Sequence, residues 1–486
     1  MTTTPLHYKT ITELAALIRK GDITAVELVE HFISRINRLD ETLNAYRLRC
    51  AERALDRAKI ADRALSEGGD HGALQGIPYA VKDLIDVNGL PTTAGARIFE
   101  QHVAAEDATV IRSLDRAGMI LVGKTNTVQF AFSGVGINHD HGTPHNPWSK
   151  THYLPGGSSS GSGVAVAAGL VPMALGTDTG GSVRVPAALC GTVGLKTTVG
   201  RVSRAGVYPL SWSLDSVGVL ARSVEDAALV YQSICGSDIN DDTTLGLGPQ
   251  DVLKNLKGGI KGKRLAFAET VFFDDIHPEV NKQVRACGDI FKHSGAEVSS
   301  IEFPEAAAAK QLNPGGVFIA SEGYTLNKKW LEENFDQLDP VVAQRMIMGK
   351  DITAANYLEN TLASKRLRAK VYNDLKDIDA LLVPTTCVPA KPVAEVDADM
   401  ETYLNHNAIY LRNTNIGNTL NLCGLSVPCG FTAKGLPIGL LIYGKPFQEE
   451  IILNIGYAYQ QRTDWHRRRP DLSWLEDANM NKGHIK

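Results

Sequence analysis

Two serines in this 486-residue chain each follow a pair of glycines, and the two turns lie close together in the sequence. Ser158 follows the glycines at 156–157, and Ser182 follows those at 180–181. Glycine permits backbone conformations that other residues avoid and lets a substrate approach the chain closely. Serines in such turns, with amide donors nearby, indicate acyl transfer, in which a serine hydroxyl forms a covalent intermediate.

The segment between the two serines predicts the elements that hold them. GSGVAVAAGL is typical of a short helix packed tightly through Ala and Gly, and VPMALGTDT of a buried strand that ends at the second turn. The glycines leave successive N–H groups free to converge on one point, as an oxyanion hole requires. The candidate donors are the amides of Thr179, Gly180, Gly181 and Ser182.

Longer blocks of sequence resemble the amidase signature family. GGSSSGSG followed by GTDTGGSVRVPAALCGTVGLKTTVGRVS is similar to the signature itself. Residues 76–95 are similar to the lysine-bearing strand and turn of that family, and residues 107–126 to its next helix and strand. The stretch from Val383 through residues 435–450 resembles its C-terminal part. Three motifs in the right order, with matching separations, make the resemblance specific, and it extends over most of the chain.

This resemblance implies a catalytic triad made of two serines and a lysine. Ser182 would be the nucleophile and Lys82 the ultimate base. Ser158, in a cis peptide bond after Gly157, would relay the proton between them.

The chemistry of a lysine base can also be examined from the residues. A serine hydroxyl is a poor nucleophile until a neighbouring base takes its proton, and no convincing Asp and His follow the glycine–serine tract in the order of a hydrolase triad. Lys82 follows the apolar run at 77–81, so we expect it at a buried strand end, where desolvation lowers its pKa. Asp83 or Asp86 would have the opposite effect if either carboxylate faced the ammonium.

Other residues are predicted to support the site or to contact the substrate. Asp178 and Arg184 bracket the second turn and are expected to pair and to hold it rigid. The resemblance places a further set around the substrate: Phe130, Phe132, Gly157, Tyr208 and Trp212. This aromatic set favours a small, mostly uncharged substrate, whereas Arg345 and Arg412 are candidates for binding a substrate carboxylate.

Composition narrows the possible classes of protein. Hydrophobic residues make up 43% of the chain and charged residues 21%, which is ordinary for a globular protein, and the net charge of −4 gives no reason to expect nucleic-acid binding. The N-terminus lacks the apolar core of a signal peptide, and no apolar run reaches the ~20 residues of a membrane span. Seven cysteines without CxxC pairs predict reduced thiols and a cytoplasmic location.

No cofactor or metal is expected. The densest group of histidines (His139, His141, His145 and His152) lies in a loop rich in Gly and Pro, without HExxH spacing or a nearby cysteine cluster. No P-loop is present in the sequence.

The order of the elements predicts an α/β fold. Residues 8–70 read as helices, with capping boxes at Thr10–Glu13 and Thr24–Glu27. From residue 76 to 236, apolar strands alternate with helices, which favours a central sheet covered on both faces. After a polar connection at 237–265 we expect a strand at 264–268, mostly helices over 278–374, and sheet elements at 380–384, 425–428 and 438–443.

We therefore predict a single domain over 1–486. It comprises a helical segment at 1–70, the signature core at 76–236 and a C-terminal part at 237–486. The mixed character of the sheet is implied by the family resemblance alone.

Three functions remain open at this stage. The first is an amidase that cleaves a small amide, carbamate or urea without a different partner chain, with a homodimer as one assembly left open. The second is the subunit of a tRNA-dependent amidotransferase that releases ammonia from glutamine, which would need companion chains and ATP. The third is an interaction protein that has kept the fold. The intact Lys82, Ser158 and Ser182 argue against the third.

Overall fold

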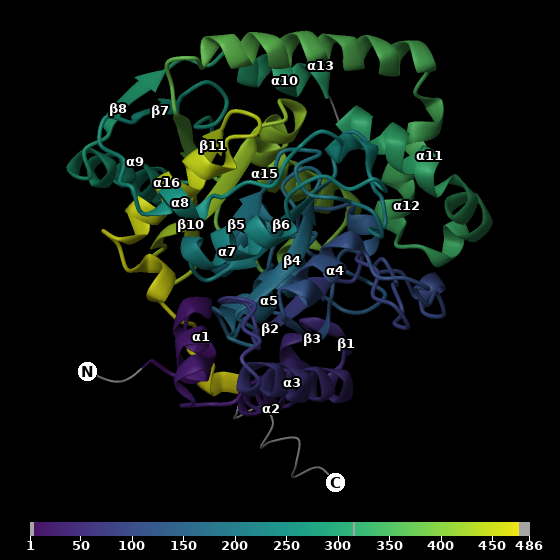
Figure 1. Cartoon of the computed structure of the whole chain (residues 1–486). Coiled ribbons are helices and arrows are strands. Elements are labelled where there is room, and N and C mark those ends of the chain that lie inside the picture. The colour runs from purple at the N-terminus through teal and green to yellow at the C-terminus, as the bar shows by residue number, and fades with distance from the viewer. Residues whose placement is uncertain (1–3, 314–315, 476–486) are drawn as a thin grey trace.

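Strands from both halves of the chain form one mixed sheet (Figure 1). The computed structural model describes residues 4–313 and 316–475, and within these ranges the sheet has 11 strands in the order β1-β3-β2-β4-β6-β5-β10-β11-β9-β7-β8. The strands are β1 (Tyr46–Arg49), β2 (Pro78–Lys82), β3 (Ile120–Thr125), β4 (Met173–Asp178), β5 (Val193–Lys196), β6 (Ser216–Ala221), β7 (Arg264–Ala268), β8 (Glu297–Ile301), β9 (Ala380–Pro384), β10 (Cys423–Phe431) and β11 (Pro437–Gly444). Parallel pairs such as β2–β4 and antiparallel pairs such as β4–β6 occur together, so the predicted mixed sheet is confirmed.

Helices cover the sheet, with the N-terminal helices at the bottom of the view and α13 across the top (Figure 1). They are α1 (Ile11–Lys20), α2 (Ala25–Leu43), α3 (Ala51–Ser66), α4 (Thr109–Arg116), α5 (Ser160–Ala167), α6 (Arg184–Cys190), α7 (Val224–Ile234), α8 (Leu253–Leu256), α9 (Pro278–His293), α10 (Glu305–Leu312), α11 (Val317–Asn334), α12 (Pro340–Ile347), α13 (Ala354–Asp374), α14 (Val393–Val396), α15 (Met400–Thr419) and α16 (Glu449–Gln460). None of those lying in the described ranges is both long and apolar enough for a bilayer span. The predicted domain bounds, 1 and 486, lie outside the described residues.

The N-terminal segment contains the predicted helices and one strand that was not predicted. Both capping boxes are present, since Thr10 and Thr24 each accept from the backbone N–H three residues on, and the glutamates there bond back to the capping residue. The expectation that residues 8–70 are entirely helical is wrong, because β1 pairs antiparallel with β3 at the sheet edge. Its four residues, YRLR, do alternate apolar and charged side chains, but a run this short between two helices gives only a weak strand signal.

The second half shows the same contrast between strong and weak sequence signals. The strands expected at 264–268 and 380–384 form as β7 and β9 with those bounds. β8 was missed within a region predicted to be mostly helical. It is an edge strand whose residues are mainly solvent-facing, so its sequence, EVSSI, has little hydrophobic pattern.

The parallel pairing of β2 with β4 brings two distant strand ends together. Lys82 is the last residue of β2 and Asp178 the last of β4, and parallel neighbours end at the same edge of a sheet. The predicted helix after the first serine turn forms as α5 and packs very closely. A Cβ at Gly161 would lie 2.2 Å from the carbonyl oxygen of Ala45, so only glycine allows this approach.

Candidate active site

Lys82 is buried at the end of β2, between two hydroxyl groups. Its Nζ lies 2.7 Å from Oγ of Ser158 and 2.8 Å from Oγ1 of Thr177, and its side chain is fully enclosed. Among the described residues, neither Asp83 nor Asp86 is a hydrogen-bond or ion-pair partner of Lys82. Thr177 was not predicted as a site residue. It lies in β4, one residue before the end of that strand and two residues before Thr179.

The surroundings of Lys82 favour its neutral form. Burial lowers the pKa of Lys82 to about 7, and the more distant charges of Asp215 and Asp178 only partly oppose this effect. The carboxylate of Asp83 faces away, with Oδ1 2.7 Å from Nζ of Lys124 in a fully buried ion pair. Lys124 therefore takes up the negative charge that would otherwise have stabilised a protonated Lys82.

Ser158 follows a cis peptide bond from Gly157, as the family resemblance implies. Its side chain is fully buried, and its carbonyl oxygen accepts from Oγ1 of Thr127 at 2.9 Å and from the N–H of Val128 at 3.2 Å. Its backbone and its side chain are thus both fixed relative to Lys82.

The second serine turn presents unused amide donors. Gly181 has φ +142°, and a Cβ there would come within 2.2 Å of Oγ1 of Thr414, so the position requires glycine. Thr414 donates to the carbonyl oxygen of Gly180 at 2.7 Å. The N–H groups of Gly180, Gly181 and Ser182 find no backbone acceptor among the described residues. Buried N–H groups are seldom left unpaired, so these donors are available to a substrate oxygen.

The two serine turns are linked directly. The N–H of Ser159 donates to the carbonyl oxygen of Ser182 at 3.2 Å, and Ser182 itself is 4% exposed. The hydroxyl of Thr179 points elsewhere, donating to Asp215 at 2.5 Å. A carbonyl group placed at Ser182 would thus meet amide donors on the same turn.

Asp178 and Arg184 form the predicted ion pair beneath this turn. Nε and Nη2 of Arg184 donate to the two carboxylate oxygens at 2.9 and 2.8 Å, and both side chains are fully buried. Burial raises the pKa of Asp178, but the charge and hydrogen bonds of Arg184 outweigh this and hold the pKa well below its usual range. Asn418 and Tyr443, from α15 and β11, complete the cluster with hydrogen bonds to the pair.

Replacing Arg184 with methionine is expected to lower the free energy of unfolding by about 3–5 kcal/mol, because it leaves Asp178 buried and uncompensated. Urea denaturation followed by circular dichroism would measure this loss. Arg264→Met is a matched control, because Arg264 and Asp377 pair with 46% and 65% of their side chains exposed, and it should cost no more than about 1 kcal/mol. Equal losses in the two variants would contradict a structural role for the buried pair.

The residues predicted to contact the substrate lie in different environments. Phe130 is 1% exposed and packs against Phe99 and Tyr208 in the core. The hydroxyl of Tyr208 donates to Asn327. Phe132 is buried beneath the guanidinium of Arg345. The N–H of Gly157 is used internally, in a bond to the carbonyl oxygen of Gly134.

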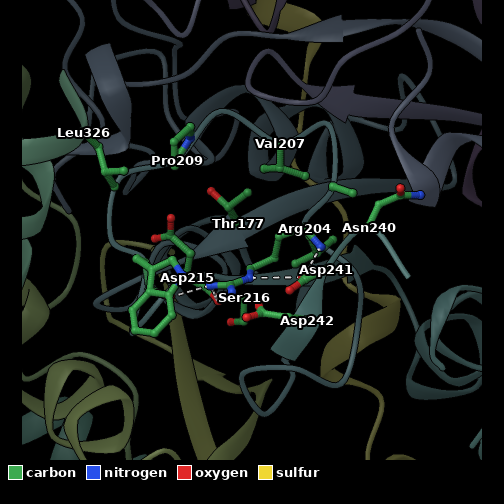
Figure 2. Close-up of a pocket in the computed structure, with 13 residues that line it drawn as sticks. Thr177, Arg204, Val207, Pro209, Asp215, Ser216, Asn240, Asp241, Asp242 and Leu326 are labelled. Carbon is green, nitrogen blue, oxygen red and sulfur yellow. Dashed lines mark hydrogen bonds and ion pairs between the residues drawn. The ribbon is translucent and has the colours of Figure 1, made fainter. Parts of the chain in front are cut away.

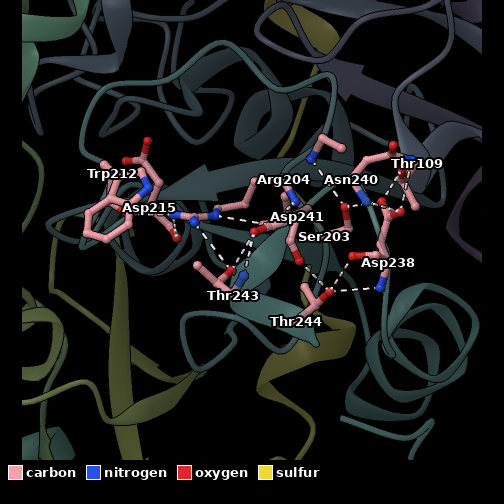
Figure 3. A network of polar contacts seen from close by, with 12 residues as sticks. Thr109, Ser203, Arg204, Trp212, Asp215, Asp238, Asn240, Asp241, Thr243 and Thr244 are labelled. Carbon is pink, nitrogen blue, oxygen red and sulfur yellow. Dashed lines mark hydrogen bonds and ion pairs between the residues drawn. The ribbon is translucent and has the colours of Figure 1, made fainter. Parts of the chain in front are cut away.

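Trp212 lines a pocket of about 240 Å³. Figure 2 shows this pocket, with Arg204, Asp215 and Leu326 among the residues around it. Thr177 and Asp215 line this pocket, and Trp212 is 60% exposed there. A hydrogen-bonded network shapes its wall, in which Arg204 bonds to the carboxylate of Asp241 and to the carbonyl oxygen of Trp212 (Figure 3). None of residues 179–182 lines it.

Side chains from two helices lie close to the turn that carries the free amide donors. A Cβ built on Gly180 would lie 3.7 Å from the side chains of Ile319 and Asn415 and 4.0 Å from that of Leu411. These side chains come from α11 and α15, and no motif in the sequence marks them. The histidines of the loop at 139–152 have other partners. His139 pairs with Asp339 and Asp397, and His145 stacks on His152.

Comparison with known proteins identifies the class to which this fold and site belong. The family model described as Amidase matches residues 27–453, and the chain belongs to the amidase signature family, whose members hydrolyse carbon–nitrogen bonds.

Two curated relatives and one solved structure illustrate the range of the family. The chain is 36% identical to a subunit of the glutamyl-tRNA(Gln) amidotransferase of Chloroflexus aurantiacus, over 96% of this chain and 99% of that protein. It is 37% identical to a 2-amino-5-chloromuconic acid deaminase of Comamonas testosteroni, over 93% and 95%. Among solved structures, the peptide amidase of Stenotrophomonas maltophilia superposes with a TM-score of 0.83 at 29% identity, covering 96% of this chain and all of the amidase.

Proposed function

We propose that this protein hydrolyses the C–N bond of a small amide, carbamate or urea-type substrate through an acyl-enzyme on Ser182. The hydrogen bond from buried Lys82 to Ser158, beside a turn with unused amide donors, is the observation that carries this proposal.

In the proposed mechanism the proton moves from Ser182 through Ser158 to Lys82. Oγ of Ser182 attacks the carbonyl carbon and gives its proton to Oγ of Ser158, whose own proton passes to the neutral Nζ of Lys82. The negative oxygen that forms is stabilised by backbone N–H groups of this turn, for which Thr179, Gly180, Gly181 and Ser182 are the candidates. The tetrahedral intermediate collapses when the C–N bond breaks, and the leaving nitrogen takes a proton back through Ser158. Water then cleaves the ester by the same steps, so the reaction consumes no cofactor.

A second candidate function is that of an amidotransferase subunit, which the relatives of that name favour. In that case glutamine would be the amide and the released ammonia would pass to a partner chain. Both functions use the same nucleophile, base and oxyanion donors, so the site chemistry alone does not separate them.

The purified chain, in chelator and without nucleotide, is expected to hydrolyse members of a panel of amides, carbamates and ureas that also contains glutamine. Mass spectrometry of the products would identify the acyl group and the leaving group. Cleavage of glutamine alone, and only after addition of amidotransferase partner chains and ATP, would favour the second candidate.

A further inference from the structure

Helix α13 lies across the outside of the molecule, and most of its residues are exposed (Figure 1). One face of it is used within the chain. Ser364 and Val371 are buried on that face, and the hydroxyl of Tyr357 donates to Glu322 of α11 at 2.6 Å. The other face is open, and its side chains are unusually regular.

Small and apolar side chains recur along this open face at alternating intervals of three and four residues. Leu358, Leu362 and Tyr372 are 56%, 43% and 54% exposed. This spacing is that of a coiled-coil seam, in which side chains of two helices interlock, and exposed apolar surface of this kind marks a contact. The α13 stripe comprises Ala355, Leu358, Leu362, Lys365, Ala369 and Tyr372, all of them exposed.

The α13 stripe is complementary in size to itself when a second copy of the helix is turned end for end. Ala355 then faces Tyr372 of the second copy. Leu358 likewise faces Ala369 of the second copy, so each large side chain meets a small one. A two-fold axis repeats both contacts, because in such an interface each pair of facing residues occurs twice.

Charged residues of α13 favour the same antiparallel pairing. Glu359 and Arg366 flank the stripe on one side, and the side chains of both are exposed, with no hydrogen bond or ion pair to other described residues. Turning the second copy end for end places Glu359 opposite Arg366 of that copy, once on each side of the axis. Leu362 at the centre is covered by the aliphatic stem of Lys365, whose ammonium can stay in water. A parallel pairing would instead oppose Lys365 to its own copy.

We infer that α13 is the contact surface of a homodimer, in which two copies of this chain pair their α13 stripes antiparallel about a two-fold axis. The contact uses no residue of the candidate active site, so the inference stands independently of the proposed function.

The length of the helix sets the expected strength of the dimer. The 21 residues of α13 extend about 30 Å. Specific interfaces commonly bury about 1,200–2,000 Å² in total, and a single pair of helices of this length falls near the lower end of that range. The dimer should therefore be reversible, with a Kd of about 1–100 μM.

Sedimentation of the full chain from about 1 to about 200 μM covers this range. The mass of the wild type should rise from that of one chain to that of two. Leu362→Glu places a charge at the centre of the seam and should raise Kd about 30-fold or more. Leu326→Glu is the matched control, because Leu326 on α11 is also 43% exposed, and its Kd should be that of the wild type.

Exchanging the two flanking charges tests the direction of the pairing. Glu359→Arg and Arg366→Glu each set like charges opposite one another and should each raise Kd about 10-fold. The double variant restores both opposite-charge pairs, and its Kd should return to within about threefold of the wild type. Circular dichroism would confirm that each variant keeps its helix content. If Leu362→Glu does not fold, the charge variants supply the comparison, because their side chains have no partners within the chain.

Cross-linking tests the register. Leu358→Cys protein mixed with Ala369→Cys protein should form an intermolecular disulfide on mild oxidation in air with a copper catalyst. Neither variant alone should cross-link, because the antiparallel seam separates identical positions by about 16 Å, well beyond the reach of a disulfide. The wild type is the control, since six of its cysteines are buried and Cys235 is partly buried.

Four outcomes would overturn the inference. The first is a wild type that stays monomeric at about 200 μM. The second is association that survives Leu362→Glu as well as it survives Leu326→Glu. The third is a double charge variant that associates no better than the single ones. The fourth is a disulfide between two copies of Leu358→Cys, which would indicate a parallel seam.

Discussion

Ser182→Ala is expected to reduce amide hydrolysis by about 10⁴-fold or more and to abolish covalent labelling by a fluorophosphonate. The substitution removes the only atom that the proposed mechanism bonds to the substrate. The fold should persist, because the contacts of this turn run through its backbone, from Ser159 to the carbonyl oxygen of Ser182 and from Thr414 to that of Gly180. Intact-mass spectrometry would follow labelling, and circular dichroism would follow the fold.

Ser158→Ala should cost less, about 10²–10³-fold, because water can partly replace a proton relay. Ser160→Ala is a matched control in the same glycine–serine tract. Its hydroxyl has no hydrogen-bond partner among the described residues, and activity should stay within about threefold of the wild type. Unchanged turnover in Ser182→Ala would end the proposal of a serine nucleophile.

Lys82→Met is expected to approach the loss seen for the nucleophile, about 10⁴-fold, and to remove the main pH dependence of activity. Burial lowers the pKa of Lys82 to about 7, and only the neutral amine can accept a proton. Activity of the wild type should therefore fall about tenfold per pH unit below that pKa and level off above it. An ascending limb that persists in a residually active Lys82→Met enzyme would assign the titration to another group.

The same pKa shift predicts a change in stability with pH. Between pH 7 and about 10, the unfolded chain holds a proton on Lys82 that the folded protein has released. The free energy of unfolding of the wild type should therefore rise relative to Lys82→Met by about 1.4 kcal/mol per pH unit in this window, and the difference should be constant below it. Urea denaturation from pH 6 to 9.5 would measure both proteins.

Comparison with the variant is needed because a second buried lysine, Lys196, also has a lowered pKa. Burial lowers the pKa of Lys196 to about 8, and within the described part of the chain its Nζ donates to the backbone carbonyl oxygens of Thr197 and Leu422. Lys196 is present in both proteins, so its contribution cancels in the difference. A difference that does not change with pH would contradict a neutral Lys82 in the folded protein.

The sequence alone determined those features that depend on neighbouring residues. Capping boxes at Thr10 and Thr24, glycines before the two serines, and strands such as β7 and β9 follow from spacings of a few positions, and the structure contains them all. The order and separation of the longer blocks also identified the family, and with it the mixed sheet. These signals are strong because capping, turn geometry and hydrophobic periodicity act over short stretches of chain.

Only the tertiary structure decided which partners the key side chains have. Asp83 is next to Lys82 in the sequence, yet it pairs with Lys124 on β3, and Lys82 instead contacts Thr177 on β4. Asn418 and Tyr443, far along the chain, complete the cluster around Asp178. The side chains nearest to Gly180 come from helices whose sequences carry no motif. Such contacts depend on how the strands are ordered in the sheet, and that order is set by packing across the whole molecule rather than by local spacing.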